Sequence, residues 1–154
     1  MDVHDEFVPE DVYAEFLRQL PQVCVELVVE HEGSVLLCHR TNEPARGEWF
    51  WPGSRLYKGE ELTAAAHRVA DEELGVGIRL EDQLGTYGHF WDASAVDSVD
   101  SRHTINVVYH ATLEDNRDEI TLDDQHDDYR FVTTIEPIFH PHVRQYLEDS
   151  QLME

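Results

Sequence analysis

Residues 52–76 decide the fold, and they read PGSRLYKGEELTAAAHRVADEELGV. A loop that contains glycine comes first, and it leads into a segment without glycine or proline. This second segment predicts a helix over about residues 61–74. Gly75 follows at once, in the position where helices commonly end on a left-handed residue. The stretch is therefore expected to fold as a loop, a helix and a glycine stop.

The acidic end of this helix has two interpretations. A carbonyl oxygen near Gly53 and a carboxylate oxygen of Glu72 or Glu73 could bind one divalent cation, because hard cations prefer oxygen ligands. Alternatively, Arg68 and Glu72 form an ion pair one turn apart on a solvated surface helix. Spacing alone leaves both interpretations open.

Length and composition indicate one folded domain over residues 1–154, because 41% of the residues are hydrophobic. There is no apolar run long enough to cross a membrane, and the acidic N-terminus does not resemble a secretory signal. The expected location is the cytoplasm, with no membrane partner. Cys24 and Cys38 fall in apolar segments and are expected to be reduced core thiols.

The formal net charge is −22, and Lys58 is the only lysine among 11 basic residues. Disorder is one interpretation, but the regular apolar segments argue against it. A cation-binding or acidic interaction surface is a second. We favour a halophilic enzyme, because in about 1 M salt the Debye length falls to about 3 Å and screens carboxylate repulsion. Nucleic acid is not an expected partner, since no basic patch is visible.

Hydrophobic periodicity predicts a mixed set of helices and strands, and hence the α+β class. Helices are expected at 9–20, 61–74 and 140–149; strands at 22–30, 35–40, 48–51, 103–113 and 129–132; apolar stretches over 77–92; and an acidic loop at 123–128.

Residues 52–76 resemble the Nudix box, whose pattern is G-x5-E-x7-R-E-U-x-E-E-x-G-U with U a bulky apolar residue. The matching residues are Glu60, Arg68, Glu72, Glu73, Gly75 and Val76. Ser54 stands where the first glycine belongs, and Val69 stands where the family has a metal-binding glutamate. The resemblance implies a Nudix-type α/β/α sandwich with a mixed central sheet.

Two further groups of residues suggest chemistry. Arg40, Arg55 and Arg68 could bind phosphate oxygens through planar guanidinium groups, or Arg40 and Arg55 could be surface residues that pair with carboxylates. Gln125 and His126 combine a neutral acceptor with an imidazole. The acidic neighbours of His126 are expected to raise its pKa above the ordinary value, which is about 6.5.

Residues 37–50, LCHRTNEPARGEWF, and 124–130, DQHDDYR, narrow the resemblance to the GDP-mannose mannosyl hydrolases, which also lack the glutamate replaced by Val69. That resemblance implies cleavage of the sugar C1–O bond with inversion, giving GDP and free hexose. It also implies a homodimer whose interface contains the N-terminal segment. The family has a phenol where Asn106 stands.

The implied roles fall on residues of several segments. One Mg²⁺ per site, replaceable by Mn²⁺, would be bound by Glu73, Gln125 and the Gly53 carbonyl, with Glu72 as a further candidate. His126 would be the general base, Arg40, Arg55 and Arg68 would stabilise the leaving GDP, and His89 would lie in the same catalytic site. Two alternatives remain, a Nudix pyrophosphatase and a catalytically silent Nudix-fold binding domain. Glu72 favours the first of these, because it retains a carboxylate of ordinary boxes.

Overall fold

The computed structural model describes residues 1–153 and has an α+β architecture. In chain order the elements are α1 (Glu10–Gln19), β1 (Gln22–His31), β2 (Ser34–Arg40), β3 (Trp49–Phe50), β4 (Gly53–Arg55), α2 (Leu62–Val69), the π-helical turn η1 (Ala70–Leu74), β5 (Ile78–Trp91), β6 (Arg102–Leu113), the 3₁₀ turn η2 (Arg117–Glu119), β7 (His126–Val132) and α3 (Pro141–Ser150).

All the strands belong to one seven-stranded mixed sheet. The main path runs β3-β2-β1-β6-β5, while β4 pairs with β1 and β7 pairs with β2. The pairing of β1 with β6 is parallel, and the other pairings are antiparallel. Because β1 and β2 pair only near their turn, β4 takes up the free edge of β1, and this brings the loop before the box helix into the sheet.

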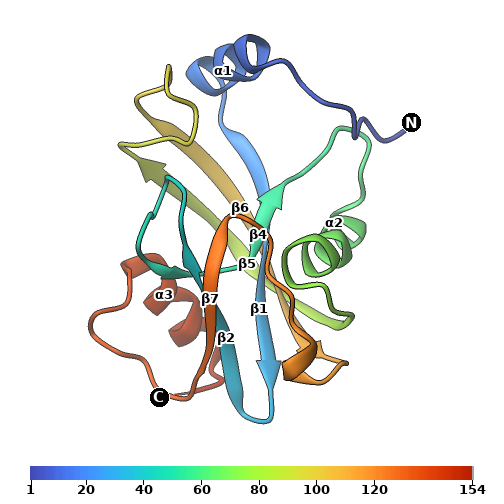
Figure 1. Ribbon diagram of the computed structural model, residues 1–154, viewed down its shortest axis with the longest axis vertical. Helices are drawn as coiled ribbons and strands as arrows, with labels where there is room; N and C mark the ends of the chain where they lie inside the picture. Colours follow the sequence, from blue (N-terminus) through green and yellow to red (C-terminus); the bar gives the residue numbers. More distant parts are fainter. Residues whose placement is uncertain (154) are drawn as a thin grey trace.

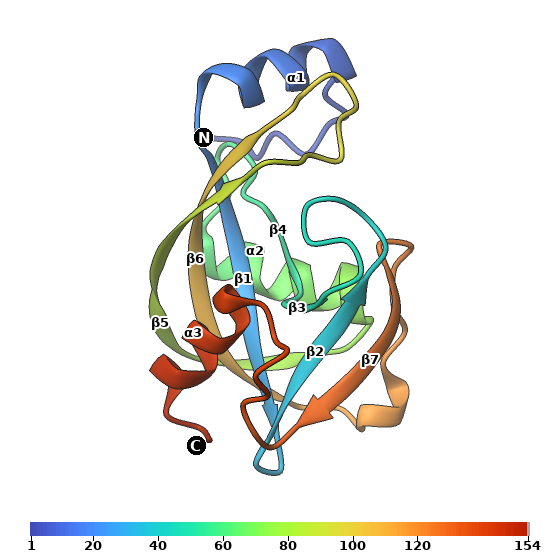
Figure 2. The ribbon, with the colours of Figure 1, turned by 90° about the vertical axis from the view of Figure 1, so that its left-hand side faces the viewer.

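Helices cover both faces of this sheet, as the α/β/α expectation required (Figures 1 and 2). Val25, Leu27 and Val29 alternate along β1 and pack in one buried cluster with α2. Val28 points the other way and packs in a second cluster with α3, which contributes Tyr146 among others. This alternation follows from the two-residue period of a strand.

The box helix has an unexpected end. Helix α2 stops at Val69, and the chain continues through η1 to Gly75, which has the left-handed φ of 64° that its position predicted. In a π-helical turn the hydrogen bonds reach one residue further than in an α-helix, and such turns are frequent at functional sites. Here the turn carries Glu72 and Glu73.

One strand boundary needs correction, and one stretch now has a defined structure. Strand β7 begins at His126 and not at residue 129, so His126 is not in an acidic loop but at the start of a strand that pairs with β2. The apolar stretches over 77–92 form one continuous strand, β5, because β6 pairs with it along its length.

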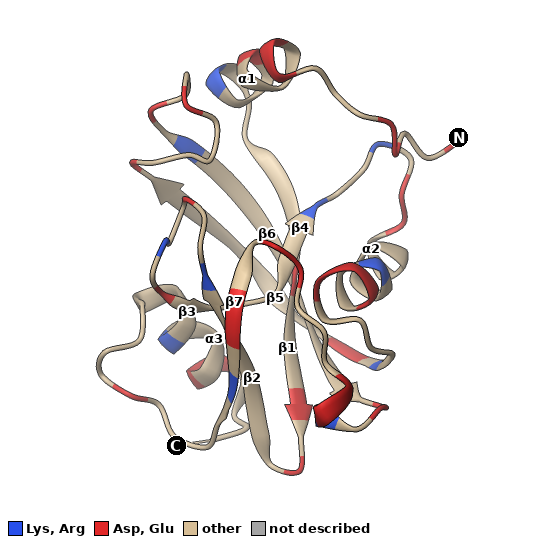
Figure 3. Cartoon of the chain, viewed as in Figure 1, with Lys and Arg blue, Asp and Glu red and all other residues tan. Residues whose placement is uncertain are grey.

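Acidic side chains are distributed over helices, strands and loops and do not form a tail (Figure 3). Within residues 1–153, no helix has both the length and the apolar character needed to cross a membrane.

Candidate active site at the box helix and the sheet

Strand register places polar side chains side by side on the face of the sheet that carries α3. Arg55 of β4, Cys24 of β1 and Asn106 of β6 lie opposite one another in one row. Thr104 and His89 are paired beside them, on β6 and β5. Side chains two residues apart on a strand share a face, so these rows form the floor of a single surface.

A cleft of about 280 Å³ opens over this floor, and Arg40, Gly53, Arg55, His89 and Gln125 all line it. Five of the nine residues predicted for the site therefore meet in one cavity. They come from three strands, β2, β4 and β5, and from the segment before β7.

The loop after β2 brings Arg40 and Gln125 together. The Thr41 backbone N–H donates to the Gln125 carbonyl at 2.9 Å, so the segment before β7 is tied to the end of β2. The Nε of Arg40 donates to the Pro44 carbonyl at 2.8 Å, and burial lowers the pKa of this guanidinium from its ordinary value. No ion pair within residues 1–153 involves Arg40 or Arg55, which removes the interpretation that they serve to hold surface carboxylates.

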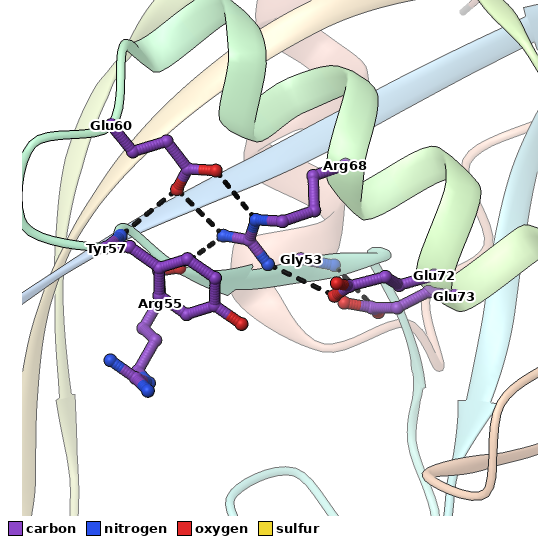
Figure 4. Close-up of polar contacts among 7 residues, drawn as sticks. All are labelled: Gly53, Arg55, Tyr57, Glu60, Arg68, Glu72 and Glu73. Atoms are coloured by element: carbon purple, nitrogen blue, oxygen red, sulfur yellow. Dashed lines mark hydrogen bonds and ion pairs between the residues drawn. The ribbon is translucent and has the colours of Figure 1, made fainter. Parts of the chain in front are cut away.

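Arg68 lies outside this cavity, within the box (Figure 4). Its guanidinium donates to Glu60, to the Arg55 carbonyl at 2.8 Å and to Glu72 at 3.2 Å. The ring of Tyr57 lies 3.9 Å below it. The ion pair between Arg68 and Glu72 that the spacing predicted is therefore present.

An acidic cluster adjoins the cleft at Gly53. The carboxylates of Glu73 and Asp123 and the imidazole of His126 have ligand atoms within 4.8 Å of one another. The Gly53 N–H donates to Glu73 at 3.1 Å. A Cβ at Gly53 would lie 2.7 Å from the Glu26 Cγ, so glycine is required at this close approach of β4 to β1.

The cluster fits a divalent cation. Burial and the nearby Asp123 carboxylate raise the pKa of Glu73 to about 8, because two adjacent acids disfavour a second negative charge. Burial also leaves His126 Nε2 without a hydrogen-bond partner. The two carboxylates supply oxygen ligands, which a hard divalent cation prefers.

The pKa of His126 is shifted in the direction opposite to that expected from the sequence. Its Nδ1 lies 2.7 Å from the Asp123 carboxylate, and its side chain is fully buried. Burial lowers the pKa of His126 below its ordinary value, although Asp123 acts in the opposite direction. The acidic neighbours are present, but the loss of solvent outweighs them.

His89 is neutral and sits in an aromatic group. Burial and His142 lower the pKa of His89 to about 3, and the two rings stack with centroids 3.5 Å apart. The Tyr146 hydroxyl lies 3.1 Å from His89 Nε2 and donates to Glu26 at 2.7 Å. Glu26, Tyr146 and His89 therefore form a buried hydrogen-bonded chain from β1 through α3 to β5.

Sequence reasoning missed three residues here. Asp123 belonged to a segment already noted as acidic, so its composition offered a signal. Glu26 is an acid within an otherwise apolar strand and shares a face with Cys24, which also was a signal. Arg102 precedes the expected start of its strand, and no pattern distinguished it.

The mixed sheet between helices, with a glycine loop and an acidic helix end beside a cleft, has the architecture of a Nudix domain. The chain belongs to the Nudix family: the NUDIX domain model matches residues 18–149. It is a Nudix hydrolase.

Curated relatives and solved structures agree with membership of the Nudix family. The chain is 45% identical over 141 residues to the low-salt glycan biosynthesis protein Agl8 of Haloferax volcanii, covering 92% of this chain and 89% of that protein. It is 30% identical over 89 residues to an ADP-ribose pyrophosphatase of Methanocaldococcus jannaschii, covering 58% of this chain and 49% of that protein. A MutT Nudix hydrolase from Burkholderia pseudomallei has the same fold, with a TM-score of 0.68, 24% identity, and coverage of 85% of this chain and 98% of that one.

Proposed function

We propose that the protein hydrolyses GDP-mannose or a related GDP-hexose at the sugar C1–O bond, with inversion and with Mg²⁺, to give GDP and free hexose. A nucleotide-sugar substrate agrees with the name of the Haloferax relative, which refers to glycan biosynthesis.

The observation that carries this proposal is the environment of Val69. This side chain is fully buried in the apolar cluster between α2 and the sheet, where a carboxylate would be unfavourable. The box therefore offers one carboxylate fewer than ordinary Nudix boxes. A site with fewer carboxylates suits one metal ion, whereas attack of water at phosphorus favours more charge around the metals.

Glu73, Gln125 and the Gly53 carbonyl are the proposed ligands of one Mg²⁺, which Mn²⁺ could replace. Asp123 joins this set because it belongs to the acidic cluster. Glu72 is a weaker candidate, because its half-exposed carboxylate is already paired with Arg68. When bound, the metal supplies positive charge to the departing diphosphate.

His126 is the proposed general base. The Asp123 carboxylate next to Nδ1 favours a proton on that nitrogen and leaves the lone pair on Nε2. A neutral imidazole is the form that accepts a proton, and burial favours it. The role requires a water molecule to reach Nε2, and this atom is closed to solvent in the structure.

Arg40 and Arg55 are proposed to stabilise the leaving GDP from the cleft, where neither is paired with a carboxylate. His89 lines the same cleft. Arg68 was expected in the same role, but its donors are used within the box, so we assign it to holding the loop of the box against α2.

A Nudix pyrophosphatase is the alternative. It is favoured by Glu72, which retains an ordinary box carboxylate, and by the similarity to an ADP-ribose pyrophosphatase.

Product analysis separates the two reactions. The protein is incubated with GDP-mannose and Mg²⁺ in high salt. GDP and mannose support the proposal, GMP and mannose 1-phosphate support the pyrophosphatase, and the absence of turnover supports a silent binding domain. In ¹⁸O-water, cleavage of the C–O bond places the label on mannose, while attack at phosphorus places it on a phosphate.

The remaining proposals concern the domain organisation, the cellular location and the oligomeric state. We propose a single domain in the cytoplasm of a high-salt cell, assembled as a homodimer. The exposed apolar side chains of Val12 and Phe16 on α1, and of Leu20 just after it, support a dimer interface near the N-terminus. Sedimentation in molar KCl tests the oligomeric state.

A further inference from the structure

Arg102 is a third arginine in the cleft, and the family resemblance does not assign it. It is the first residue of β6 and lies two residues before Thr104, on the face that carries Thr104 and Asn106. All three residues line the cleft together with Arg55. Arg102 therefore lies in the cleft, whereas Arg68 lies in the box.

Neutral groups position the Arg102 guanidinium. Its Nη2 donates to the Gln22 side-chain oxygen and contacts the Cys24 sulfur at 3.8 Å. Its Nε is a buried donor without a partner, and the hydrogen bonds found within residues 1–153 use only Nη2. Buried donors without partners are rare in folded proteins, and a bound ligand is one explanation for them.

The guanidinium of Arg102 also has no ion-pair partner among the described residues. Arg102 takes part in none of the ion pairs within residues 1–153, although acids outnumber basic residues 33 to 11. Two carboxylates line the cleft, but they have other partners. Glu43 pairs with Arg46 at 3.4 Å, and Glu26 accepts the Tyr146 hydroxyl. Within residues 1–153, no arginine of the cleft thus forms an ion pair with a carboxylate.

Arg55 approaches the same point from the other side of β1. It lies opposite Cys24 in register, and Cys24 is the residue that Arg102 contacts. The Arg55 guanidinium lies over the rings of Tyr57 and Tyr13, at 4.7 and 5.7 Å from their centroids. Stacking holds the plane of a guanidinium while leaving its N–H edges available to a ligand.

We propose that Arg102, together with Arg55, binds the diphosphate of the nucleotide substrate and of the GDP product. Two guanidinium groups present planar forks of donors that match phosphate oxygens. In the related mannosyl hydrolases a phenol at the position of Asn106 is expected to contact the leaving group. This chain has asparagine there, and Arg102 would supply a cationic contact to the leaving group. This inference rests on a nucleoside diphosphate substrate, but not on which bond is cleaved.

Equilibrium binding tests it without reference to the reaction. Dissociation constants for GDP, pyrophosphate and guanosine are measured by calorimetry with excess Mg²⁺ at one KCl concentration. Arg102→Gln is expected to raise the dissociation constants for GDP and pyrophosphate by about tenfold or more, because charge-assisted hydrogen bonds are lost. Guanosine affinity is expected to stay unchanged. Arg79→Gln, at an exposed arginine of β5 paired with Glu81, is the matched control and is expected to bind like the wild type.

Thermal unfolding of each variant shows whether it is folded. If Arg102→Gln does not fold, Arg102→Lys takes its place, with an expected weakening of about threefold because the charge stays while the fork is lost. Unchanged affinity for GDP and pyrophosphate in the folded variant overturns the proposal. The proposal is also overturned if Arg102→Gln weakens the binding of guanosine and GDP but not of pyrophosphate, because Arg102 would then contact the nucleoside. It is likewise overturned if the wild-type protein binds neither GDP nor pyrophosphate. GDP-mannose cleavage to GMP leaves this inference standing and removes only the proposed reaction.

Discussion

The Arg68 guanidinium donates two hydrogen bonds to the Glu60 carboxylate, Nε to Oε2 at 2.7 Å and Nη2 to Oε1 at 3.0 Å (Figure 4). The side chains are only 15% and 6% exposed, so solvent screens the pair weakly. Glu60 also accepts the Tyr57 N–H at 3.1 Å. The pair therefore connects the loop before α2 to the last turn of that helix.

Replacing Arg68 by glutamine is expected to lower the free energy of unfolding by about 3 kcal/mol, because Glu60 is left buried without its partner. Chemical denaturation in molar KCl measures this. Arg79→Gln, which removes an exposed pair, is the control and is expected to leave the stability nearly unchanged, because solvent screens exposed charges. If Arg68→Gln left the stability unchanged but weakened GDP binding, Arg68 would instead be assigned to contact with the leaving group.

His126→Gln is expected to lower kcat by about 10²-fold or more while the Kd for substrate changes little, because a general base acts only in the transition state. The glutamine keeps a polar group of similar size. Asp123→Asn is expected to lower kcat as well, since the Nδ1 proton loses its carboxylate acceptor. An unaltered rate in His126→Gln would rule out this residue as the base.

Glu73→Gln is expected to weaken Mg²⁺ binding, because it removes a buried carboxylate of the acidic cluster. A cation that binds only the folded state stabilises it by about 2.7 kcal/mol at one hundred times its Kd. Wild type should therefore gain melting temperature with Mg²⁺ and lose it with EDTA, and Glu73→Gln should show a much smaller gain. Glu61→Gln, at an exposed residue just before α2, is the control. An equal gain in both variants argues against Glu73 as a ligand.

Glu26 is expected to make stability depend on pH. Burial raises the pKa of Glu26 from its ordinary 4.5 to about 7. Between these values the folded state binds more protons than the unfolded state, so the free energy of unfolding falls as the pH rises, by about 3 kcal/mol in all. Glu26→Gln accepts the same Tyr146 hydrogen bond without a charge. It should be more stable than wild type at about pH 8 and similar at about pH 4. Parallel pH profiles of the two proteins would contradict this.

Salt is expected to stabilise the protein, because a net charge of −22 repels itself at low ionic strength. The melting temperature should therefore rise from low salt to molar KCl. A higher melting temperature in low salt would remove the proposal of a high-salt cytoplasm.

Local patterns predicted much of the fold. Glycine and proline positions and apolar periodicity located α1, the hairpin of β1 and β2, and the helix that ends at Gly75, because these signals act between residues close in sequence. The start of β7 was placed three residues too late. Its first residues alternate weakly in hydrophobicity, and pairing with β2 decides that they are strand.

The site could be predicted only in part. The box supplied Gly53 and Glu73, the segment 124–130 supplied His126, and the acidic cluster contains Glu73 and His126. Arg68 is expected from the sequence to contact the leaving GDP, but it lies in the box and outside the cleft. The sequence does not show that the N–H groups of Arg68 donate to Glu60. Likewise the pKa of His126 was expected to rise, because charge can be counted in a sequence whereas burial cannot.

By itself the sequence determined the elements, the alternation of β1 and the residue types available for chemistry. Only the tertiary structure decided which of them share a cavity. Arg55, Cys24 and Asn106 meet because β4 pairs with one edge of β1 and β6 with the other, and Arg102 joins them through the same register. The physical reason is that strand pairing joins segments far apart in the chain, and local propensity carries no information about which edges will meet.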